Sequence, residues 1–515
     1  MNNGYLIGLD FGSESAREVL IEASSGRVVD HLAHAYAHAV MTETLPGGQT
    51  LPKGWALQYA PDYVQAAEII LAGLGREREV LSIGIGFTAS TPLPCTADGM
   101  PLSTLFPDQP HAYVKLWKHQ SAQPWADRIN AAGGDYLANF GGKLSGEWLL
   151  AKAAQLADEA PEIWRASERF IEAGDWLVWQ LTGQEARSES FAAYKAQYRR
   201  GFGYPADVVP GLAERLREPL PVGSYAGQLT TDWRARTGIL GLALVAVAII
   251  DSHVALPALG IVDSGSLMGA LGTSAAFLLL DQTARPLATG IEGMAFGAAI
   301  PRLWCHEAGQ ASFGDLLAWF VRAFPRSGNA EQTFDAYNDA AGKMQPGENH
   351  LLALDWWNGC RVPFGDSALN GLLVGFNLGS TAVDIYRSLL ESLCFGARTI
   401  VDRLASNGAP IERVVVTGGL AQKNAVLMQM LADVLGRELQ VPLLPEPTAI
   451  GAAIHGAVAA GVVADFAEGA QRFGAQDFKT YQPDATLFPA YDAIYRRYQA
   501  LSGNAELRRL MHGFG

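Results

Sequence analysis

The stretch YLIGLDFGSESAREVLIEA, residues 5–23, decides the fold class of this chain. Two apolar runs, Tyr5–Asp10 and Glu18–Ala23, flank a short turn of small polar residues and predict two strands. A third strand is expected at Arg27–His34, after the turn SSG. Consecutive strands joined by turns this short form an antiparallel meander.

A second strand–turn–strand pattern begins about half a chain length later. The apolar runs Leu267–Leu271 and Ala275–Leu280 flank the small-residue turn Gly272-Thr273-Ser274. This pattern matches the first one, in which Gly12 opens the turn. We therefore expect two α/β domains of related topology.

Strands followed by helices recur elsewhere and support that class. A helix is expected at Pro61–Leu74 and a strand at Val80–Phe87. The segment Arg413–Gly436 predicts a strand, a glycine turn and a helix, because its apolar residues then repeat at helical spacing until a glycine. A longer helix is expected at Asp384–Leu404. Alternating strands and helices are typical of layered α/β domains.

Composition bounds the class of protein. The 515 residues are 49% hydrophobic and 17% charged, which excludes a largely disordered chain. The net charge of −14 argues against nucleic-acid partners, which need a positive surface. Glycine is in excess, at 56 residues. Such a surplus serves turns, close packing or backbone approach to a ligand.

Cysteines and apolar segments indicate a cytoplasmic protein without a membrane partner. The four cysteines are scattered and form no CxxC, so a zinc site or a disulfide framework is not expected. The N-terminus has no basic region ahead of its apolar run, which excludes a signal peptide. The most apolar run, Ile239–Ile250, is shorter than the roughly 20 residues that cross a bilayer. We expect a buried strand with its approach there.

Three glycine turns are candidates for phosphate binding. In the first, Asp10 ends a strand and the following turn offers backbone amides, hydroxyls and Arg17. Such a cradle suits phosphate oxygens, and the carboxylate suits Mg²⁺. An ordinary polar hairpin turn is the alternative here and at Gly272-Thr273-Ser274. Thr417-Gly418-Gly419 would let a ligand approach the backbone, or serve close packing of helix and strand.

Two carboxylates are further candidates. Asp251 follows a buried apolar run, at the strand end where α/β folds place ligands, and could act as a general base or cap a helix. Glu307 could bind sugar hydroxyls or take part in capping and packing. The segment between His111 and His119 lacks the spacing of a metal site. P-loop and serine-hydrolase motifs are absent.

Together these pieces resemble the FGGY carbohydrate kinases, and most closely the bacterial ribulokinase branch of that family. The matching stretches run in family order from about residue 5 to residue 461: IGLDFGSESAR, WALQYAPDY, HAYVKLWKH, GGKLSGEW, EAGDWLVWQLTG, AAYKAQY, IIDSHVALPALG, EAGQASFGDLLAWF, LALDWWNGCRVP, GLLVGFNLGSTAVDIYRSLLES and VVVTGGLAQKNAVLMQMLADVLG. The resemblance implies an α/β fold of two ribonuclease-H-like domains of the actin/hexokinase superfamily. It divides the chain at residues 1–245 and 246–515, with an interdomain cleft as the active site.

The resemblance also implies an activity: phosphorylation of the terminal hydroxyl of a ketopentose by ATP and Mg²⁺. Ribulose is the first choice, which implies a role in arabinose catabolism. A xylulokinase or polyol kinase is the alternative within the family, and an actin-like ATPase without kinase activity is the alternative from a different functional class. Sugar and ATP are the expected partners, with no nucleic acid and no membrane, and a homodimer is left open.

Site residues follow by matching positions. The matches to the two phosphate loops are Asp10, Gly12, Ser13, Ser15 and Arg17 in the first and Gly272 and Thr273 in the second. Positions that line the nucleotide match Gly314, Gly418, Gly419 and Asn424. Asp251 matches the catalytic base, and Ala89, Lys195 and Glu307 match sugar positions. Asp10 is the implied Mg²⁺ ligand, directly or through water.

Three departures from the family pattern concern the sugar more than the reaction. The first loop has Ser13 where the family usually has threonine, which retains the hydroxyl. The strand before FTAST ends in Gly86 rather than the usual aspartate. Ala276-Phe277 stands where ribulokinases typically have Cys-His.

Overall fold

The computed structural model describes residues 4–287, 290–326 and 328–512. The chain forms two compact units, and each is built from separate stretches of sequence. Unit 1 comprises Met1–Val262, Ala295–Cys305 and Leu444–Ala475, and unit 2 comprises Asp263–Met294, His306–Leu443 and Gln476–Gly515.

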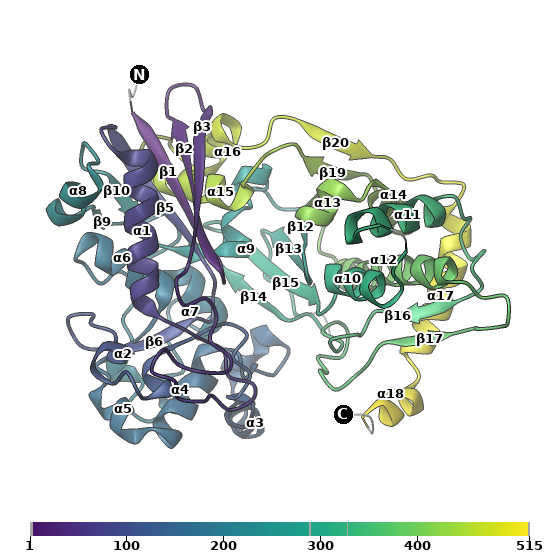
Figure 1. Ribbon diagram of the computed structural model, residues 1–515, viewed down its shortest axis with the longest axis horizontal. Helices are drawn as coiled ribbons and strands as arrows, with labels where there is room; N and C mark the ends of the chain where they lie inside the picture. The colour runs from purple at the N-terminus through teal and green to yellow at the C-terminus, as the bar shows by residue number, and fades with distance from the viewer. Residues whose placement is uncertain (1–3, 288–289, 327, 513–515) are drawn as a thin grey trace. The chain divides into compact units, whose positions relative to one another are not determined.

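Unit 1 contains a seven-stranded sheet that opens with the predicted meander (Figure 1). Strand β1 (Tyr5–Phe11) pairs antiparallel with β2 (Ser15–Glu22), which pairs antiparallel with β3 (Val28–Ala35). On its other side β1 pairs parallel with β5 (Val80–Phe87), whose bounds are those predicted. The strand order is β3-β2-β1-β5-β10-β9, and β11 also pairs with β5; the added strands are β9 (Tyr225–Gln228), β10 (Leu244–Ala246) and β11 (Ile249–Ile250).

Helices cover both faces of this sheet. Side chains alternate between the faces of a strand, and on β1 Phe11 contacts Tyr63 of α1 (Ala60–Gly75) whereas Gly8 faces α15 (Pro447–Ala459). A Cβ on Gly8 would lie 1.8 Å from the carbonyl oxygen of Ala449. One on Gly84 of β5 would lie 1.7 Å from that of Ala452. Part of the glycine surplus therefore permits direct packing of a helix backbone on the sheet.

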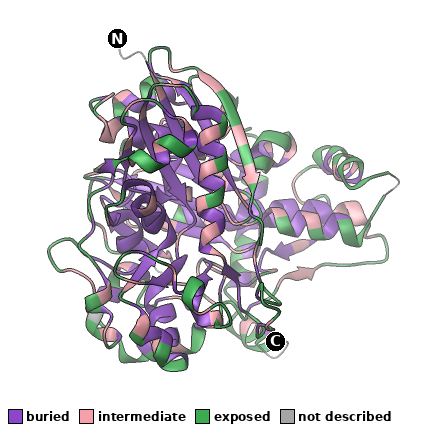
Figure 2. Cartoon of the chain, turned by 60° about the vertical axis from the view of Figure 1, so that its left-hand side comes forward, coloured by how far each residue is buried: buried purple, intermediate pink, exposed green. Residues whose placement is uncertain are grey.

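The remaining helices and strands of unit 1 surround this sheet or extend it. They are β4 (Leu57–Gln58), β6 (Pro92–Cys95), β7 (Val114–Lys115), β8 (Arg169–Glu172), α2 (Leu102–Leu105), α3 (Gln123–Ala132), α4 (Leu149–Glu159), α5 (Pro161–Ala166), α6 (Ala173–Thr182), α7 (Glu189–Lys195), α8 (Thr231–Thr237), α9 (Asp251–Val254) and α16 (Phe466–Phe473). Residues of α3 to α5 and their loops form a second hydrophobic core. In Figure 2 most strands are buried and most exposed residues lie on loops and outer helix sides.

The sheet of unit 2 repeats the topology of unit 1. Strand β12 (Ser266–Leu271) pairs antiparallel with β13 (Ala275–Asp281) and parallel with β18 (Arg413–Thr417). The full order is β14-β15-β13-β12-β18-β19-β20, with β14 (Gly293–Phe296), β15 (Trp304–Gln310), β19 (Leu439–Pro442) and β20 (Phe478–Tyr481). The predicted relation between the two halves of the chain is confirmed.

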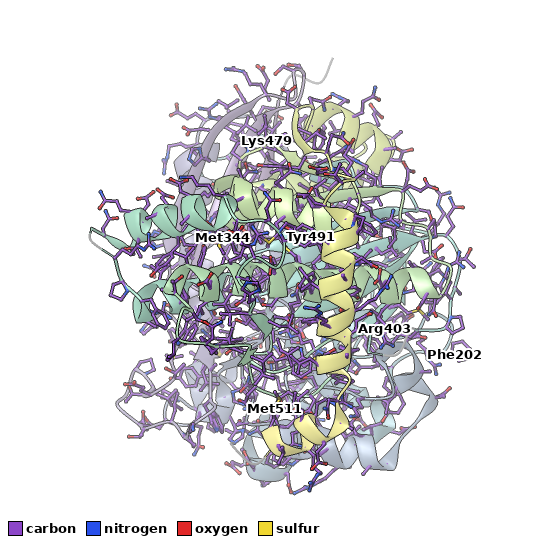
Figure 3. The ribbon with its side chains drawn as sticks, turned by 90° about the vertical axis from the view of Figure 1, so that its right-hand side faces the viewer. Phe202, Met344, Arg403, Lys479, Tyr491 and Met511 are labelled. Atoms are coloured by element: carbon purple, nitrogen blue, oxygen red, sulfur yellow. The ribbon has the colours of Figure 1, made fainter. Side chains whose placement is uncertain are left out.

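The core of unit 2 is built around α12 (Ala382–Ser406), which contacts α10, α11, α14 and α17. The helices of this unit are α10 (Gly314–Ala323), α11 (Ala330–Gly342), α13 (Gly419–Lys423), α14 (Ala425–Leu435), α17 (Phe488–Ser502) and α18 (Ala505–Met511), and β16 (Leu352–Leu354) pairs with β17 (Leu372–Val374). A buried ion pair joins Arg387 and Glu391 of α12, with Nε and Oε1 2.8 Å apart. Arg387 also donates to the hydroxyl of Tyr491 on α17, labelled in Figure 3.

Two expectations differ from the structure in detail. The run Ile239–Ile250 contains two short strands, β10 and β11, rather than one. The helix expected before Gly436 is confirmed as α14, and the short helix α13, which was not expected, precedes it. The compact units do not follow the division at residue 245, since β11 pairs with β5 and α15 packs on β1 and β5. That division stays a prediction about sequence domains.

Within the described ranges, no helix is both long enough and apolar enough to cross a membrane.

Candidate active site

The carboxyl ends of three neighbouring strands of unit 1 bring predicted site residues together. Asp10 of β1 lies opposite Gly86 of β5, and Ile250 of β11 lies opposite Phe87 of β5. Asp251 directly follows that position on β11. Parallel strands therefore place the two carboxylates on either side of the end of β5, the edge where α/β sheets place ligands.

Asp10 is nearly buried, at 6% exposure, beside several charges. Burial and, to a smaller extent, the charge of Asp251 raise the pKa of its carboxyl, Arg17 opposes the shift, and the net pKa is about 7. Arg17 lies opposite Asp10 on β2, and its Nη1 donates to Oδ2 over 3.3 Å. The charge of Glu446, at the start of α15, also raises the pKa of Asp10. The sequence analysis did not identify Glu446.

The first glycine turn leaves room above its backbone. Gly12 opens the turn, and its amide donates to the carbonyl of Ser15 over 3.0 Å. Gly12 does not have a positive φ, and a Cβ there would meet only that carbonyl oxygen, at 3.4 Å. Neither backbone conformation nor packing therefore requires glycine at this position. Free space beside amides is what a phosphate needs.

Side chains from three distant segments hold this turn. The Tyr36 hydroxyl donates to the Gly12 carbonyl over 3.0 Å. Gln58 donates to the Ser13 carbonyl over 2.7 Å, and the Trp117 indole N–H donates to Ser13 Oγ over 2.9 Å. Tyr36 and Gln58 were missed by sequence reasoning. The Trp117 contact gives the LWKH segment a role that its composition alone did not indicate.

Asp251 begins the short helix α9 and is partly exposed. Its Oδ1 accepts from the amide of the next residue, Ser252, over 2.7 Å. Asp251 is the first helical residue of α9, and the N-cap is Ile250, whose side chain makes no capping hydrogen bond. The capping alternative for Asp251 is therefore not supported, and its role as general base stays a prediction.

The predicted sugar positions of unit 1 lie on segments next to these strands. Ala89 lies in the turn Thr88–Thr91 that follows β5. Lys195 ends α7, with its Nζ 6.0 Å from the ring centre of Trp148 and 5.7 Å from that of Tyr194. Helix α7 packs against β11, where Ser190 Oγ accepts from the amide of Ile250 over 3.3 Å.

The second glycine turn, in unit 2, is supported by backbone rather than by side chains. Its carbonyls accept from the start of α10: Gly314 donates to Gly272 over 2.9 Å, and Phe313 and Asp315 donate to Thr273 over 2.8 and 3.1 Å. A Cβ on Gly272 would meet only the Ser274 carbonyl, at 3.6 Å. This turn therefore has free space like the first.

The other glycines predicted to line the nucleotide in unit 2 are of two kinds: two that the fold requires and one that it does not. A Cβ on Gly314 would lie 2.6 Å from the Gly272 carbonyl, and one on Gly418, whose φ is +101°, would lie 2.4 Å from the Leu271 carbonyl. The fold itself requires these two glycines. A Cβ on Gly419 would meet nothing within 4 Å, so its backbone is open to a ligand. The sequence alone does not distinguish the required glycines from the open one.

Asn424 and Glu307 complete the predicted residues. Asn424 is 1% exposed, and its side chain accepts from the Leu427 amide over 2.9 Å and donates to Asn338 over 3.0 Å. Asn424 therefore caps α14, and its contact with a nucleotide stays a prediction. Glu307 lies on β15 and is partly buried, and its carbonyl accepts from the amide of Glu292.

The departures from the family pattern have structural counterparts. A Cβ on Gly86 would lie 2.9 Å from a methyl of Val254, so α9 fills the space that an aspartate side chain would need. Phe277 is 2% exposed and packs beside Gly269 in the core of unit 2.

Comparisons with known proteins agree with this arrangement. A ribulokinase from Geobacillus thermodenitrificans is 36% identical over 551 aligned positions, which cover 99% of this chain and 97% of that protein. A ribulokinase from Mycolicibacterium smegmatis is 38% identical, with coverage of 98% and 96%. The model of the FGGY family of carbohydrate kinases, C-terminal domain, matches residues 267–460.

The chain belongs to the FGGY family of carbohydrate kinases. Solved structures of this carbohydrate kinase family share its fold. A xylulose kinase from Rhodospirillum rubrum has a TM-score of 0.84 at 21% identity, covering 99% of this chain and 100% of that one. A gluconate kinase from Lactobacillus acidophilus has a TM-score of 0.83 at 18% identity, covering 99% and 98%. The expected actin/hexokinase-like fold of two α/β bodies is confirmed.

Proposed function

We propose that this kinase transfers the γ-phosphoryl group of ATP to the terminal hydroxyl of a ketopentose, ribulose in the first place, with Asp251 as general base. The observation that carries the proposal is the pair of carboxylates, Asp10 and Asp251, on either side of the end of β5, beside a glycine turn with free space. The relatives that match over nearly their full length are named ribulokinases, which supports the choice of sugar.

Asp251 would accept the proton of the sugar hydroxyl while that oxygen attacks the γ-phosphorus in line. A carboxylate at a strand end and partly exposed is accessible to such a hydroxyl. The strand register places it across the end of β5 from Asp10, and its charge raises the pKa of that residue after the larger effect of burial. Lys195, Ala89 and Glu307 are the proposed sugar contacts, matched from the family.

Charge on the transferring group would be stabilised by backbone amides and by Arg17. The open glycines Gly12, Gly272 and Gly419 allow a polyphosphate to approach the backbone. Fixed amide donors and a guanidinium aimed at developing charge are the main source of catalysis in phosphoryl transfer. Thr273 and Ser13 would add hydroxyl donors, and Ser15 begins β2 at the end of the first turn.

The site fits Mg²⁺ held mainly by substrate. In the described part of the chain no three His, Cys, Asp or Glu side chains form a metal cluster. Mg²⁺ in kinases keeps several waters and takes one or two carboxylates plus phosphates. Asp10, with Asp251 beside it, would hold the ion, whose chemistry is to neutralise phosphate charge. Burial and then the charge of Asp251 raise the pKa of Asp10, and a bound cation would oppose that shift.

The cysteines support a cytoplasmic location. All four, Cys95, Cys305, Cys360 and Cys394, are buried and free. Burial raises the pKa of the Cys95 thiol to about 12, which keeps it unreactive. A protein with only buried thiols suits a reducing compartment. A role in arabinose catabolism is part of the same proposal.

The test is an ADP-release assay coupled to a dehydrogenase, across L-ribulose, D-ribulose, L- and D-xylulose, ribitol and arabitol. We expect the largest kcat/KM with one enantiomer of ribulose. If a xylulose or a polyol is the best substrate, the choice of ribulose is wrong but the proposed kinase activity holds. An ATPase rate that no sugar changes would contradict the proposal.

A further inference from the structure

A buried lysine joins two segments of unit 1. Lys152 of α4 is 0% exposed. Its Nζ donates to the carbonyls of Ser90 over 2.6 Å, Leu116 over 2.8 Å and Lys115 over 3.3 Å. An ammonium has three protons, so these carbonyls use its full donor capacity. An ammonium group is rarely buried at all unless its hydrogen bonds are satisfied in this way.

The first of these carbonyls belongs to the predicted sugar turn. Ser90 directly follows Ala89 in the turn Thr88–Thr91, which we call the Ala89 loop. Ser90 has a φ of +64°, a conformation that residues other than glycine rarely adopt. Such strain persists only where surrounding contacts determine the conformation. The bond from Lys152 to the Ser90 carbonyl is one such contact.

A second buried charge holds the other side of the same peptide group, the one that joins Ser90 to Thr91. Glu172, at the end of β8, is 3% exposed, and its Oε2 accepts from the Thr91 amide over 2.7 Å. Burial raises the pKa of Glu172 and lowers that of Lys152, and the charge of each residue opposes the shift of the other. The strained residue therefore has a cation bound on its carbonyl and a carboxylate bound on the following amide.

The other two carbonyls connect Lys152 with the first phosphate turn. Lys115 and Leu116 immediately precede Trp117, whose indole N–H donates to Ser13 Oγ. One ammonium thus contacts both the Ala89 loop and the segment that presents Trp117 to Ser13. No direct bond to a ligand is needed for this connection.

We infer that Lys152 is a positioning residue that fixes the Ala89 loop in its strained conformation, against the segment that carries Trp117, with Glu172 as the second residue that holds the loop. The inference rests on the proposed function, in which Ala89 contacts the sugar. Lys152 acts on the sugar through the backbone of Ser90, and its loss would let the loop relax. A displacement of about 1 Å at a substrate-positioning group can reduce a rate by roughly 10²-fold.

Lys152→Met tests this directly, because methionine keeps a similar volume and removes the three donors. We expect kcat/KM for the best sugar to fall by about 10- to 100-fold. The dissociation constant of ATP, measured without sugar by titration calorimetry, should change less than about threefold. An equal loss for both substrates, or an unchanged kcat/KM in a folded variant, would overturn the inference.

Glu391→Gln provides a matched control. It also removes a charge from a buried pair, Arg387–Glu391, but this pair belongs to the core of unit 2, whereas the Ala89 loop belongs to unit 1. This variant should lose thermal stability and keep the wild-type kcat/KM for sugar. A sugar defect equal to that of Lys152→Met would mean that general destabilisation explains both, and would overturn the inference.

If Lys152→Met does not fold, two variants of Glu172 test the same inference. Glu172→Gln retains an oxygen for the Thr91 amide and should keep most of the sugar affinity, whereas Glu172→Met should raise the sugar KM at least several-fold. Equal sugar KM values in folded Gln and Met variants would overturn the inference. Failure of the proposed function is distinct, because wild-type protein would then phosphorylate none of the sugars.

Discussion

The two glycine turns occupy equivalent places in two sheets of the same topology, yet they are held differently. Three side chains hold the turn after β1: Tyr36, Gln58 and Trp117. Backbone amides at the start of α10 hold the turn after β12. Both turns have three residues between their strands and a glycine that the fold does not require. The shared property is open space beside amides, which points to a shared ligand chemistry.

The charges around the two turns also differ. Asp10 precedes Gly12 by two residues, and the equivalent residue before Gly272 is Ala270. Beside the first turn, the charges of Asp251 and Glu446 act on Asp10, whereas Asp315 meets the second turn through its backbone amide. The comparison teaches that one topology can surround an open glycine turn with different groups, carboxylates in one sheet and backbone amides in the other.

The largest effect should come from the base beside the first turn. Asp251→Asn keeps the size of the side chain and its bond to the Ser252 amide but removes proton acceptance. We expect kcat to fall by about 10²- to 10⁴-fold, as for loss of a general base, with ATP affinity nearly unchanged by calorimetry. Asp232→Asn, a surface acid of unit 1, should keep wild-type turnover. A near-normal kcat in Asp251→Asn would contradict the assignment of Asp251 as the general base.

The next effect concerns Asp10, whose equivalent before the second turn is Ala270. The pKa of Asp10 is raised from 3.8 to about 7, so the native carboxyl holds its proton to higher pH than the unfolded one. Stability from this group is therefore present at low pH and is lost as pH rises from about 4 to about 7. The loss is roughly 4 kcal/mol at most, at 1.36 kcal/mol for each unit.

Urea unfolding at several pH values measures this. The free energy of unfolding of ligand-free wild type should fall relative to Asp10→Asn between about pH 4 and pH 7 and stay parallel above. Parallel curves through the whole range would contradict the raised pKa.

Two glycine substitutions sharpen the comparison between open and required positions. Gly314→Ala brings a Cβ within 2.6 Å of the Gly272 carbonyl and should cost about 1–3 kcal/mol in stability. Gly12→Ala meets no such obstacle and should keep its melting temperature, while ATP affinity falls about tenfold because the methyl group fills the open space. Calorimetry and thermal unfolding on the same samples check both. Wild-type ATP affinity in Gly12→Ala would remove this turn from the phosphate site.

The smallest effect should come from one supporting side chain of the first turn. Trp117→Phe removes the bond to Ser13 Oγ, worth about 0.5–1.5 kcal/mol, so KM for ATP should rise roughly 2- to 10-fold. Trp125→Phe is the control, since its indole bonds Asp158 on the surface. Similar KM values for the two variants would mean that side-chain support of the turn has no effect on the nucleotide.

Much of the fold could be predicted from local patterns. The meander and β5 follow from apolar runs bounded by turns, and the related turns Gly12 and Gly272 reveal the repeated topology. Helix α13 was not predicted because the apolar stripe that predicts α14 begins only at Val426. Tyr36, Gln58 and Glu446 were missed because they meet the turn from far along the chain, and no local pattern records such contacts.

The central claim is phosphoryl transfer to the terminal hydroxyl of a pentulose, and the product itself tests it most directly. Wild-type protein is mixed with ATP, Mg²⁺ and L- or D-ribulose and followed by ³¹P NMR. We predict a new phosphomonoester signal coupled to a terminal CH₂, growing as the γ-phosphate signal of ATP declines, and almost none with Asp251→Asn. Release of inorganic phosphate alone, or a phosphomonoester formed equally fast by Asp251→Asn, would contradict the account.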